Sequence, residues 1–145
     1  MNLSGKNAVV CVTGGIAAYK TCHVVSSLRK AGARVFVVMT KNATEFVTPL
    51  TFETLSGNRV VTDTFDRDFE WEVEHVSLAK KADIFIVAPM TADFAAKLAR
   101  GIADDFASTT ALAMKCPMLL APAMNVNMIT AEAYEENDKI LRGRG

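Results

Sequence analysis

Residues 13–17 (TGGIA) form the first segment whose composition could serve chemistry. The two glycines allow a tight turn and a close approach of the backbone to a ligand. An apolar periodic stretch begins at Ile16, so a helix starting there would present unpaired N–H groups to an anion. The segment lacks the third glycine of a GxGxxG motif and the Lys and Ser/Thr pair of a Walker A loop. Anion binding and a plain strand-to-helix turn both stay open at this point.

Residues 88–93 (APMTAD) place a hydroxyl and a carboxylate at the expected start of a helix. Thr91 and Asp93 could line a ligand pocket. Each could equally cap the helix by accepting hydrogen bonds from its first N–H groups. On this segment alone the cap is the favoured interpretation.

Residues 101–110 (GIADDFASTT) contain two adjacent carboxylates followed by hydroxyl groups. Asp104 and Asp105 could act as general acid and base, or could cap the helix that follows. Ser108 and Thr109 could reach a phosphate group from the first turn of that helix.

Residues 122–128 (PAMNVNM) combine two Met and two Asn directly after a predicted strand. The carboxamides of Asn125 and Asn127 could donate N–H groups to a carboxylate, and the thioethers of Met124 and Met128 could pack on a flat ring. The alternative is a simple turn with Asn in left-handed geometry.

His75 stands in a polar segment shortly after Trp71, the single Trp of the chain. A lone His in such a segment is commonly a surface residue. The sequence has no Ser-His-Asp elbow and no His or Cys spacing suited to a metal, so we expect no metal.

Strands are predicted where apolar residues form continuous rather than alternating runs, which is typical of strands buried on both faces of a parallel sheet. These runs span residues 8–12, 35–39, 84–88 and 118–121, with a weaker pair at 60–61.

Helices are predicted between the strands from helical spacing, from Pro49 in a first turn and from glycines at the ends. They span residues 16–30, 48–57, 91–100, 105–114 and 130–141.

This alternation predicts an α/β fold, a three-layer, doubly wound parallel sheet of flavodoxin-like or Rossmann-like type with five strands. Ligands of such sheets bind outside the carboxyl ends of the strands. The loops at those ends are residues 13–16, 40–46, 89–93 and 122–128, which hold most of the residues singled out above.

The composition narrows the class of protein. The 145 residues suit one domain, and 16 basic against 16 acidic side chains argue against a nucleic-acid partner. No apolar run approaches the roughly 20 residues of a membrane helix, so we expect no membrane partner and a cytoplasmic protein. The three Cys are predicted to be reduced thiols. A hydrophobic fraction of 50% is high for this size and suggests apolar surface that meets a partner chain or a cofactor.

Taken together, the motifs resemble one family. Residues 14–20 (GGIAAYK), the segment around His75, residues 88–93 and 101–109, and the PxMNxxM pattern at 122–128 are similar to the homo-oligomeric flavin-containing cysteine decarboxylases. Within that family the resemblance is to the branch that acts on phosphopantothenoylcysteine in coenzyme A biosynthesis. It covers essentially the whole chain.

The resemblance implies a flavodoxin-like fold, bound FMN, and homotrimers that can assemble into homododecamers. It implies that His75 is the active-site base, acting across a subunit interface, and that Asn125 holds the substrate carboxylate, with Met128 beside it. Its implied cofactor contacts are Gly14, Gly15, Ile16, Ala17, Thr40, Phe46, Pro89, Thr91, Ala92, Asp93, Ser108, Thr109 and Met124.

The implied reaction is the FMN-dependent decarboxylation of (R)-4'-phospho-N-pantothenoylcysteine to 4'-phosphopantetheine. It would proceed by flavin oxidation to a thioaldehyde and an enethiolate intermediate. The alternatives are a peptidyl-cysteine decarboxylase or a flavin prenyltransferase of the same fold, and a non-catalytic FMN-binding regulatory subunit.

Two departures from the family pattern bear on the domain organisation. Ile129 follows the PxMNxxM motif where relatives often carry an aromatic residue. None of Cys11, Cys22 and Cys116 stands where the coenzyme A branch has the Cys of its substrate clamp. We therefore expect residues 1–145 to be the FMN-binding domain without the C-terminal clamp, fused to or working with a phosphopantothenoylcysteine synthetase.

Overall fold

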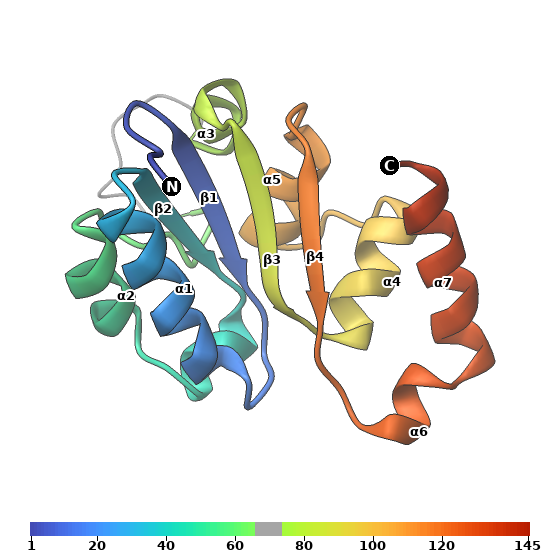
Figure 1. The fold of residues 1–145 in the computed structure, drawn as a ribbon. Coiled ribbons are helices and arrows are strands. Elements are labelled where there is room, and N and C mark those ends of the chain that lie inside the picture. The colour runs from blue at the N-terminus through green and yellow to red at the C-terminus, as the bar shows by residue number, and fades with distance from the viewer. Residues whose placement is uncertain (66–73) are drawn as a thin grey trace.

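The computed structural model describes residues 1–65 and 74–145, apart from the side chains of Glu74 and His75 (Figure 1). Its centre is a sheet of four parallel strands in the order β2-β1-β3-β4. The strands are β1 (Asn7–Val12), β2 (Arg34–Met39), β3 (Ile84–Met90) and β4 (Met118–Pro122).

Helices cover both faces of the sheet. In Figure 1, α1 and α2 lie together on one face, α3 and α5 lie on the other, and α4 and α7 pack side by side near β4. The predicted three-layer, doubly wound α/β class is therefore confirmed. The helices are α1 (Ala18–Lys30), α2 (Pro49–Ser56), α3 (Glu74–Lys81), α4 (Ala92–Arg100), α5 (Phe106–Ala113) and α7 (Glu132–Gly143), with short η1 (Lys41–Glu45) and α6 (Val126–Ile129).

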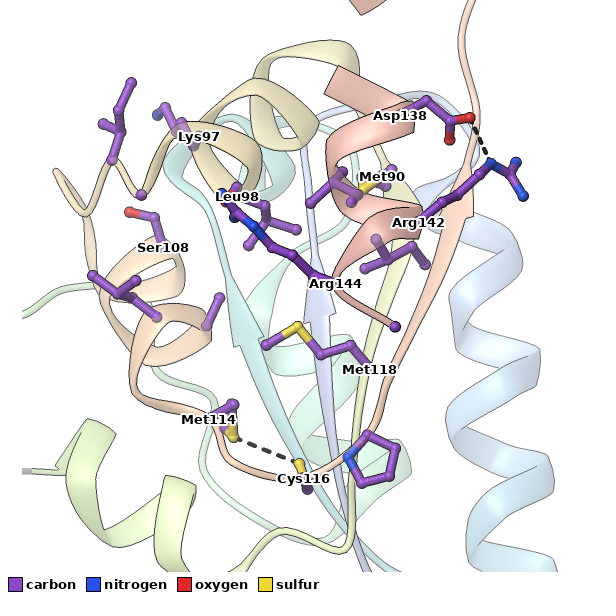
Figure 2. A pocket seen from close by; sticks show the side chains of 18 of the residues that line it. Met90, Lys97, Leu98, Ser108, Met114, Cys116, Met118, Asp138, Arg142 and Arg144 are labelled. Atoms are coloured by element: carbon purple, nitrogen blue, oxygen red, sulfur yellow. Dashed lines mark hydrogen bonds and ion pairs between the residues drawn. The ribbon is translucent and has the colours of Figure 1, made fainter. Parts of the chain in front are cut away.

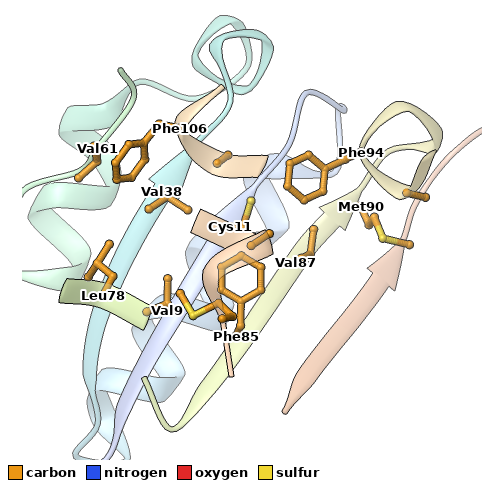
Figure 3. Packing of buried hydrophobic residues seen from close by; sticks show 14 of the residues in the cluster. Val9, Cys11, Val38, Val61, Leu78, Phe85, Val87, Met90, Phe94 and Phe106 are labelled. Carbon is orange, nitrogen blue, oxygen red and sulfur yellow. The ribbon is translucent and has the colours of Figure 1, made fainter. Parts of the chain in front are cut away.

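The continuous apolar runs arise because successive side chains of a strand point to opposite faces and both faces are covered. Val10 and Val12 of β1 join the core beneath α1 and α2. Val9 and Cys11 join the core beneath α3 and α5, where Figure 3 shows them beside Phe85. A doubly wound sheet thus needs an apolar residue at nearly every strand position.

Some predicted elements differ from the structure. Val60 and Val61 do not form a fifth strand, because only Val61 pairs, in a single parallel bridge with Val38, and a pair of apolar residues is too short to extend a ladder. Helix α3 was not predicted. Its segment is polar, and Leu78 is its one fully buried apolar side chain among those described.

The helix-end signals mostly hold. Pro49 opens α2, and Gly57 and Gly101 end α2 and α4 at φ of 71° each, in the left-handed region that glycine adopts without strain. All three cysteines are free, as predicted. Within the described part of the chain, no helix has both the length and the apolar character needed to cross a membrane.

The two-faced core makes a simple prediction. Phe85→Ala removes a fully buried ring and should lower the free energy of unfolding by about 3–5 kcal/mol. Leu112→Ala, at a side chain of α5 that is 59% exposed, should change it by no more than about 0.5 kcal/mol. Urea unfolding followed by circular dichroism measures both, and equal losses in the two variants would contradict the assigned core.

Candidate functional site

The four predicted loops meet at the carboxyl edge of the sheet. A Cβ on Gly14 would collide with Asn42 of η1, so only glycine at position 14 lets the first loop pack against η1. A Cβ on Gly15 would lie 3.7 Å from Thr91, which places the first loop beside the loop after β3. The amide of Ala123 donates to the carbonyl of Met90 over 3.1 Å, which ties the loop after β4 to the same place.

The first loop leaves backbone donors unused. Ala17 is the N-cap of α1 and gives no side-chain cap, while Gly15 and Ala18 donate their N–H groups within the loop. Among the described residues, no acceptor meets the amides of Ile16 and Ala17. Two free amides at the positive end of a 13-residue helix are suited to bind an anion.

The loop after β3 is held by capping. Thr91 accepts a hydrogen bond from the amide of Phe94 at 3.2 Å and is the N-cap of α4, which confirms the cap interpretation for Thr91. Pro89 is buried and follows a cis peptide bond, Ala92 is partly buried, and Asp93 is exposed. A cap and a ligand contact are compatible, because the cap uses only the side-chain oxygen of Thr91.

The start of α5 is a capping box. Asp105 accepts from the amide of Ser108 at 2.7 Å and from its hydroxyl at 2.6 Å, and the hydroxyl of Thr109 donates to the Asp105 carbonyl at 2.7 Å. The cap interpretation of Asp105 is confirmed. Both hydroxyl hydrogens are engaged by Asp105, so either side chain could donate to a phosphate only by breaking one of these bonds.

Lys97 was not singled out from the sequence, although it stands four residues after Asp93 on one helix face. Its ammonium lies 3.4 Å from Asp93 and 3.1 Å from Asp104, and the side chain is only 19% exposed. Burial alone would lower the pKa of Lys97, but the hydrogen bond with Asp104 and the nearby carboxylates outweigh it and raise that pKa. The same hydrogen bond lowers the pKa of Asp104. Lys97 therefore joins the helix after β3 to the loop before α5.

The loop after β4 presents an oriented carboxamide. The Asn125 oxygen accepts from the amide of Asn127 at 2.8 Å and caps α6, and among the described residues its NH₂ group has no acceptor. Asn125 is exposed and extended, with φ of −60°, so the alternative of a left-handed turn is wrong. Met124 packs partly on the core, and Met128 is 48% exposed.

The remaining predicted residues lie around this edge or outside what is described. Thr40 follows β2 and caps η1 by accepting from the amide of Ala43 at 3.2 Å, and Phe46 follows η1 with 48% of its surface exposed. His75 is the second residue of α3, and its side chain lies outside the described residues. Its role stays a prediction.

A pocket of about 620 Å³ lies elsewhere, between α4, α5, α7 and β4 (Figure 2). Ser108 is the single predicted cofactor residue among its lining, and none of the first-loop residues reaches it. We place the candidate site at the loop edge instead, because that edge holds the free amides and the free carboxamide. In the described residues, no group of three His, Cys, Asp or Glu could hold a metal ion.

A doubly wound sheet with an amide-lined loop after its first strand belongs to the class of nucleotide-cofactor-binding α/β proteins. Comparison with known proteins specifies the family. Residues 1–145 match the model of the flavoprotein family, and the chain belongs to that family.

Two kinds of relative refine the comparison. The chain is 49% identical over 145 residues to the coenzyme A biosynthesis bifunctional protein CoaBC of Haemophilus influenzae, covering 100% of this chain and 36% of that protein. It spans about a third of the length of the curated relatives it matches, 34% and 36% in two cases.

The chain is also similar to solved structures of cysteine decarboxylases. The FMN-dependent cysteine decarboxylase SpaF shares 35% identity with a TM-score of 0.93, covering 99% of this chain and 82% of that one. A C175S mutant of a PPC decarboxylase, complexed with pantothenoylaminoethenethiol, shares 25% identity with a TM-score of 0.82, covering 95% of this chain and 78% of that one.

The Lys97 contacts predict a pH dependence. A carboxylate whose pKa is lower in the folded state stabilises the fold above its unfolded pKa and loses that effect as pH falls through the folded pKa. Lys97→Met should therefore lower the urea midpoint at pH 7, and the difference from wild type should shrink as pH falls below about 4. Lys139→Met, at an exposed position of α7, serves as the control. A Lys97→Met difference that is the same at pH 7 and pH 3 would show that its ion pairs contribute nothing.

Proposed function

We propose that this chain is the FMN-binding decarboxylase domain of a coenzyme A biosynthesis enzyme. Its proposed reaction converts (R)-4'-phospho-N-pantothenoylcysteine to 4'-phosphopantetheine and carbon dioxide. The observation that carries the proposal is the presence, at the carboxyl edge of the sheet, of two backbone amides and one carboxamide NH₂ group that have no acceptor among the described residues. The sequence identities of 49% with CoaBC and 35% with SpaF support it.

The loop edge fits FMN. The amides of Ile16 and Ala17 would receive the phosphate, helped by the positive end of α1. Gly14 and Gly15 keep that approach free of side chains. The flat ring would lie against residues of the other loops, which are Thr40, Phe46, Pro89, Thr91, Ala92, Asp93 and Met124.

Ser108 and Thr109 have a supporting place in this proposal. Their hydroxyl hydrogens bond Asp105 and so fix the start of α5, which in this proposal would lie beside the cofactor. A direct bond from either hydroxyl to the phosphate would require this capping box to open.

The chain's own residues supply binding and proton handling. FMN, when bound, supplies a reversible two-electron oxidant for the carbon that carries the substrate thiol. The NH₂ group of Asn125 would hold the substrate carboxylate, with Met128 beside it. Because Asn125 is neutral, it orients the carboxylate without the strong charge stabilisation that would oppose its loss as carbon dioxide. His75 would accept a proton during oxidation, a role suited to a group that titrates near neutral pH.

The proposal includes assembly and location. Ile16, Tyr19, Phe46 and Leu50 are large apolar side chains that are 48–73% exposed near the loop edge, which favours a homo-oligomer, a trimer or dodecamer, with His75 acting across an interface. A fused or separate synthetase partner is supported by the bifunctional name of the relatives. Three free cysteines support a cytoplasmic location.

The central test is cofactor content and turnover. The purified protein should be yellow, release FMN on denaturation, and liberate carbon dioxide from phosphopantothenoylcysteine. His75→Asn should abolish carbon dioxide release, because the proton acceptor is lost, while FMN stays bound. Wild-type turnover in the His75→Asn variant would contradict the role of His75 as the proton acceptor.

The same assay separates the alternatives by substrate. Turnover of a peptide that ends in cysteine, without turnover of phosphopantothenoylcysteine, would indicate the peptidyl-cysteine decarboxylase. Transfer of a prenyl group to flavin would indicate the prenyltransferase. Bound FMN with no reaction on any of these substrates would indicate a regulatory subunit.

Asn125 offers a matched pair of variants. Asn125→Ala removes the free NH₂ donor and should lower kcat/KM at least about tenfold, the effect of one lost hydrogen bond to a charged group. Asn127→Ala should leave kcat/KM near the wild-type value, since the contact that Asn127 makes to Asn125 uses its backbone amide. Steady-state carbon dioxide release measures both, with flavin absorbance as the check on loading. Equal kcat/KM in the two variants would exclude Asn125 from substrate binding.

A further inference from the structure

Thr13, the residue that follows β1, is 1% exposed, and its hydroxyl makes two bonds to a distant segment. The hydroxyl donates to the carbonyl of Pro89 at 2.6 Å and accepts from the amide of Thr91 at 3.0 Å. The two bonds span 76 and 78 positions of the sequence. One side-chain oxygen therefore fixes the backbone on both sides of Met90, where β3 turns into α4.

The backbone of Thr13 holds the other loop. Its carbonyl accepts the amide of Gly15 at 2.9 Å, which sets the turn that leads into α1. The carbonyl of Gly15 in turn accepts the amide of Ala18, the first residue of α1. Thr13 is thus the shared anchor of the amide-lined loop and of the loop at residues 89–93.

A second buried threonine shows why this position differs. Thr21 of α1 is 2% exposed and donates to the carbonyl of Ala88 at 2.7 Å. That bond ends one residue earlier in β3 than the bond from Thr13, and it does not reach Thr91, the first residue after the strand. Of the two hydroxyls, only that of Thr13 joins the end of β3 to the N-cap of α4, because it donates to Pro89 and accepts from Thr91.

Losing the Thr13 hydroxyl would remove the partners of the buried Pro89 carbonyl and of the partly buried Thr91 amide, so we expect the backbone there to shift to recover them. A site that holds a rigid cofactor between two loops depends on their separation, and small displacements of positioning groups have large effects on binding.

We propose that Thr13 is a positioning residue of the flavin site, which sets the separation of the first loop and the loop after β3. The inference rests on the proposed function. Thr13 acts through the backbone of Gly15, Pro89 and Thr91 and needs no contact with the cofactor. The hydroxyl at position 13 is required for tight FMN binding, and a side chain of the same shape without a hydroxyl does not replace it.

The test uses three variants of Thr13 and one control. Thr13→Val keeps the shape and removes the hydroxyl, Thr13→Ser keeps the hydroxyl, and Thr13→Cys replaces it with a weaker donor. The control is Ser56→Ala, which removes another buried hydroxyl. Ser56 bonds the backbone of Asn58, whose side chain bonds Val35 near the start of β2, at the amino edge of the sheet.

The Kd for FMN is measured on apoprotein by quenching of flavin fluorescence, and the urea midpoint is measured in parallel. Thr13→Val should raise the Kd about tenfold or more, because both bonds are lost. Thr13→Ser should stay within about twofold of wild type. Ser56→Ala should lower the urea midpoint but keep the Kd within about twofold, because it lies far from the loops.

Three results would overturn the role. They are a wild-type Kd in Thr13→Val, a Kd in Thr13→Ser as weak as in Thr13→Val, and a Ser56→Ala variant whose Kd rises as much as that of Thr13→Val. If Thr13→Val does not fold, Thr13→Cys decides, with a raised Kd expected and a wild-type Kd contradicting the role. Wild-type protein that does not bind FMN would instead overturn the proposed function, and this role with it.

Discussion

The parallel pairing of β1 with β3 is the contact on which the site depends. Because the chain crosses to β2 on one side of β1 and to β4 on the other side of β3, the connections diverge at this pair, and α1 and α4 leave toward opposite faces. The crevice between the two strand ends is where ligands of doubly wound sheets bind. Thr13 closes that junction with a buried hydroxyl, so the two loops that border the crevice have a fixed spacing.

Helix caps and ion pairs fix the positions of the other elements around these two loops. Thr91 fixes the start of α4, Lys97 joins α4 to Asp104, and Asp105 fixes the start of α5. Asn125 caps α6 with its oxygen and so leaves its NH₂ group directed away from the backbone bond. The capping groups that hold the elements in place thus also set which donors stay free for a ligand.

Much of the fold follows from the sequence because its signals are local. Continuous apolar runs such as residues 84–88 predict strands buried on both faces, and Pro49 and Gly57 mark the ends of α2. The segment of α3 gave no such signal, since its helical register depends on burying Leu78 under the sheet. The pair at residues 60–61 is apolar like a strand, but only its position beside Val38 decides that it forms one bridge.

The sequence predicts which loops form the candidate site, but not the hydrogen bonds and ion pairs that join those loops. The loops follow from strand ends, and the family resemblance added roles for Asn125 and His75. The bonds of Thr13 and the ion pairs of Lys97 were missed, because they join segments whose closeness arises only when the sheet is assembled. The most direct test of the account is an experimental structure of the FMN-loaded protein. It should show the phosphate on the amides of Ile16 and Ala17, with the ring beside residues 89–93. FMN seated instead in the pocket between α4, α5 and α7 would contradict the account.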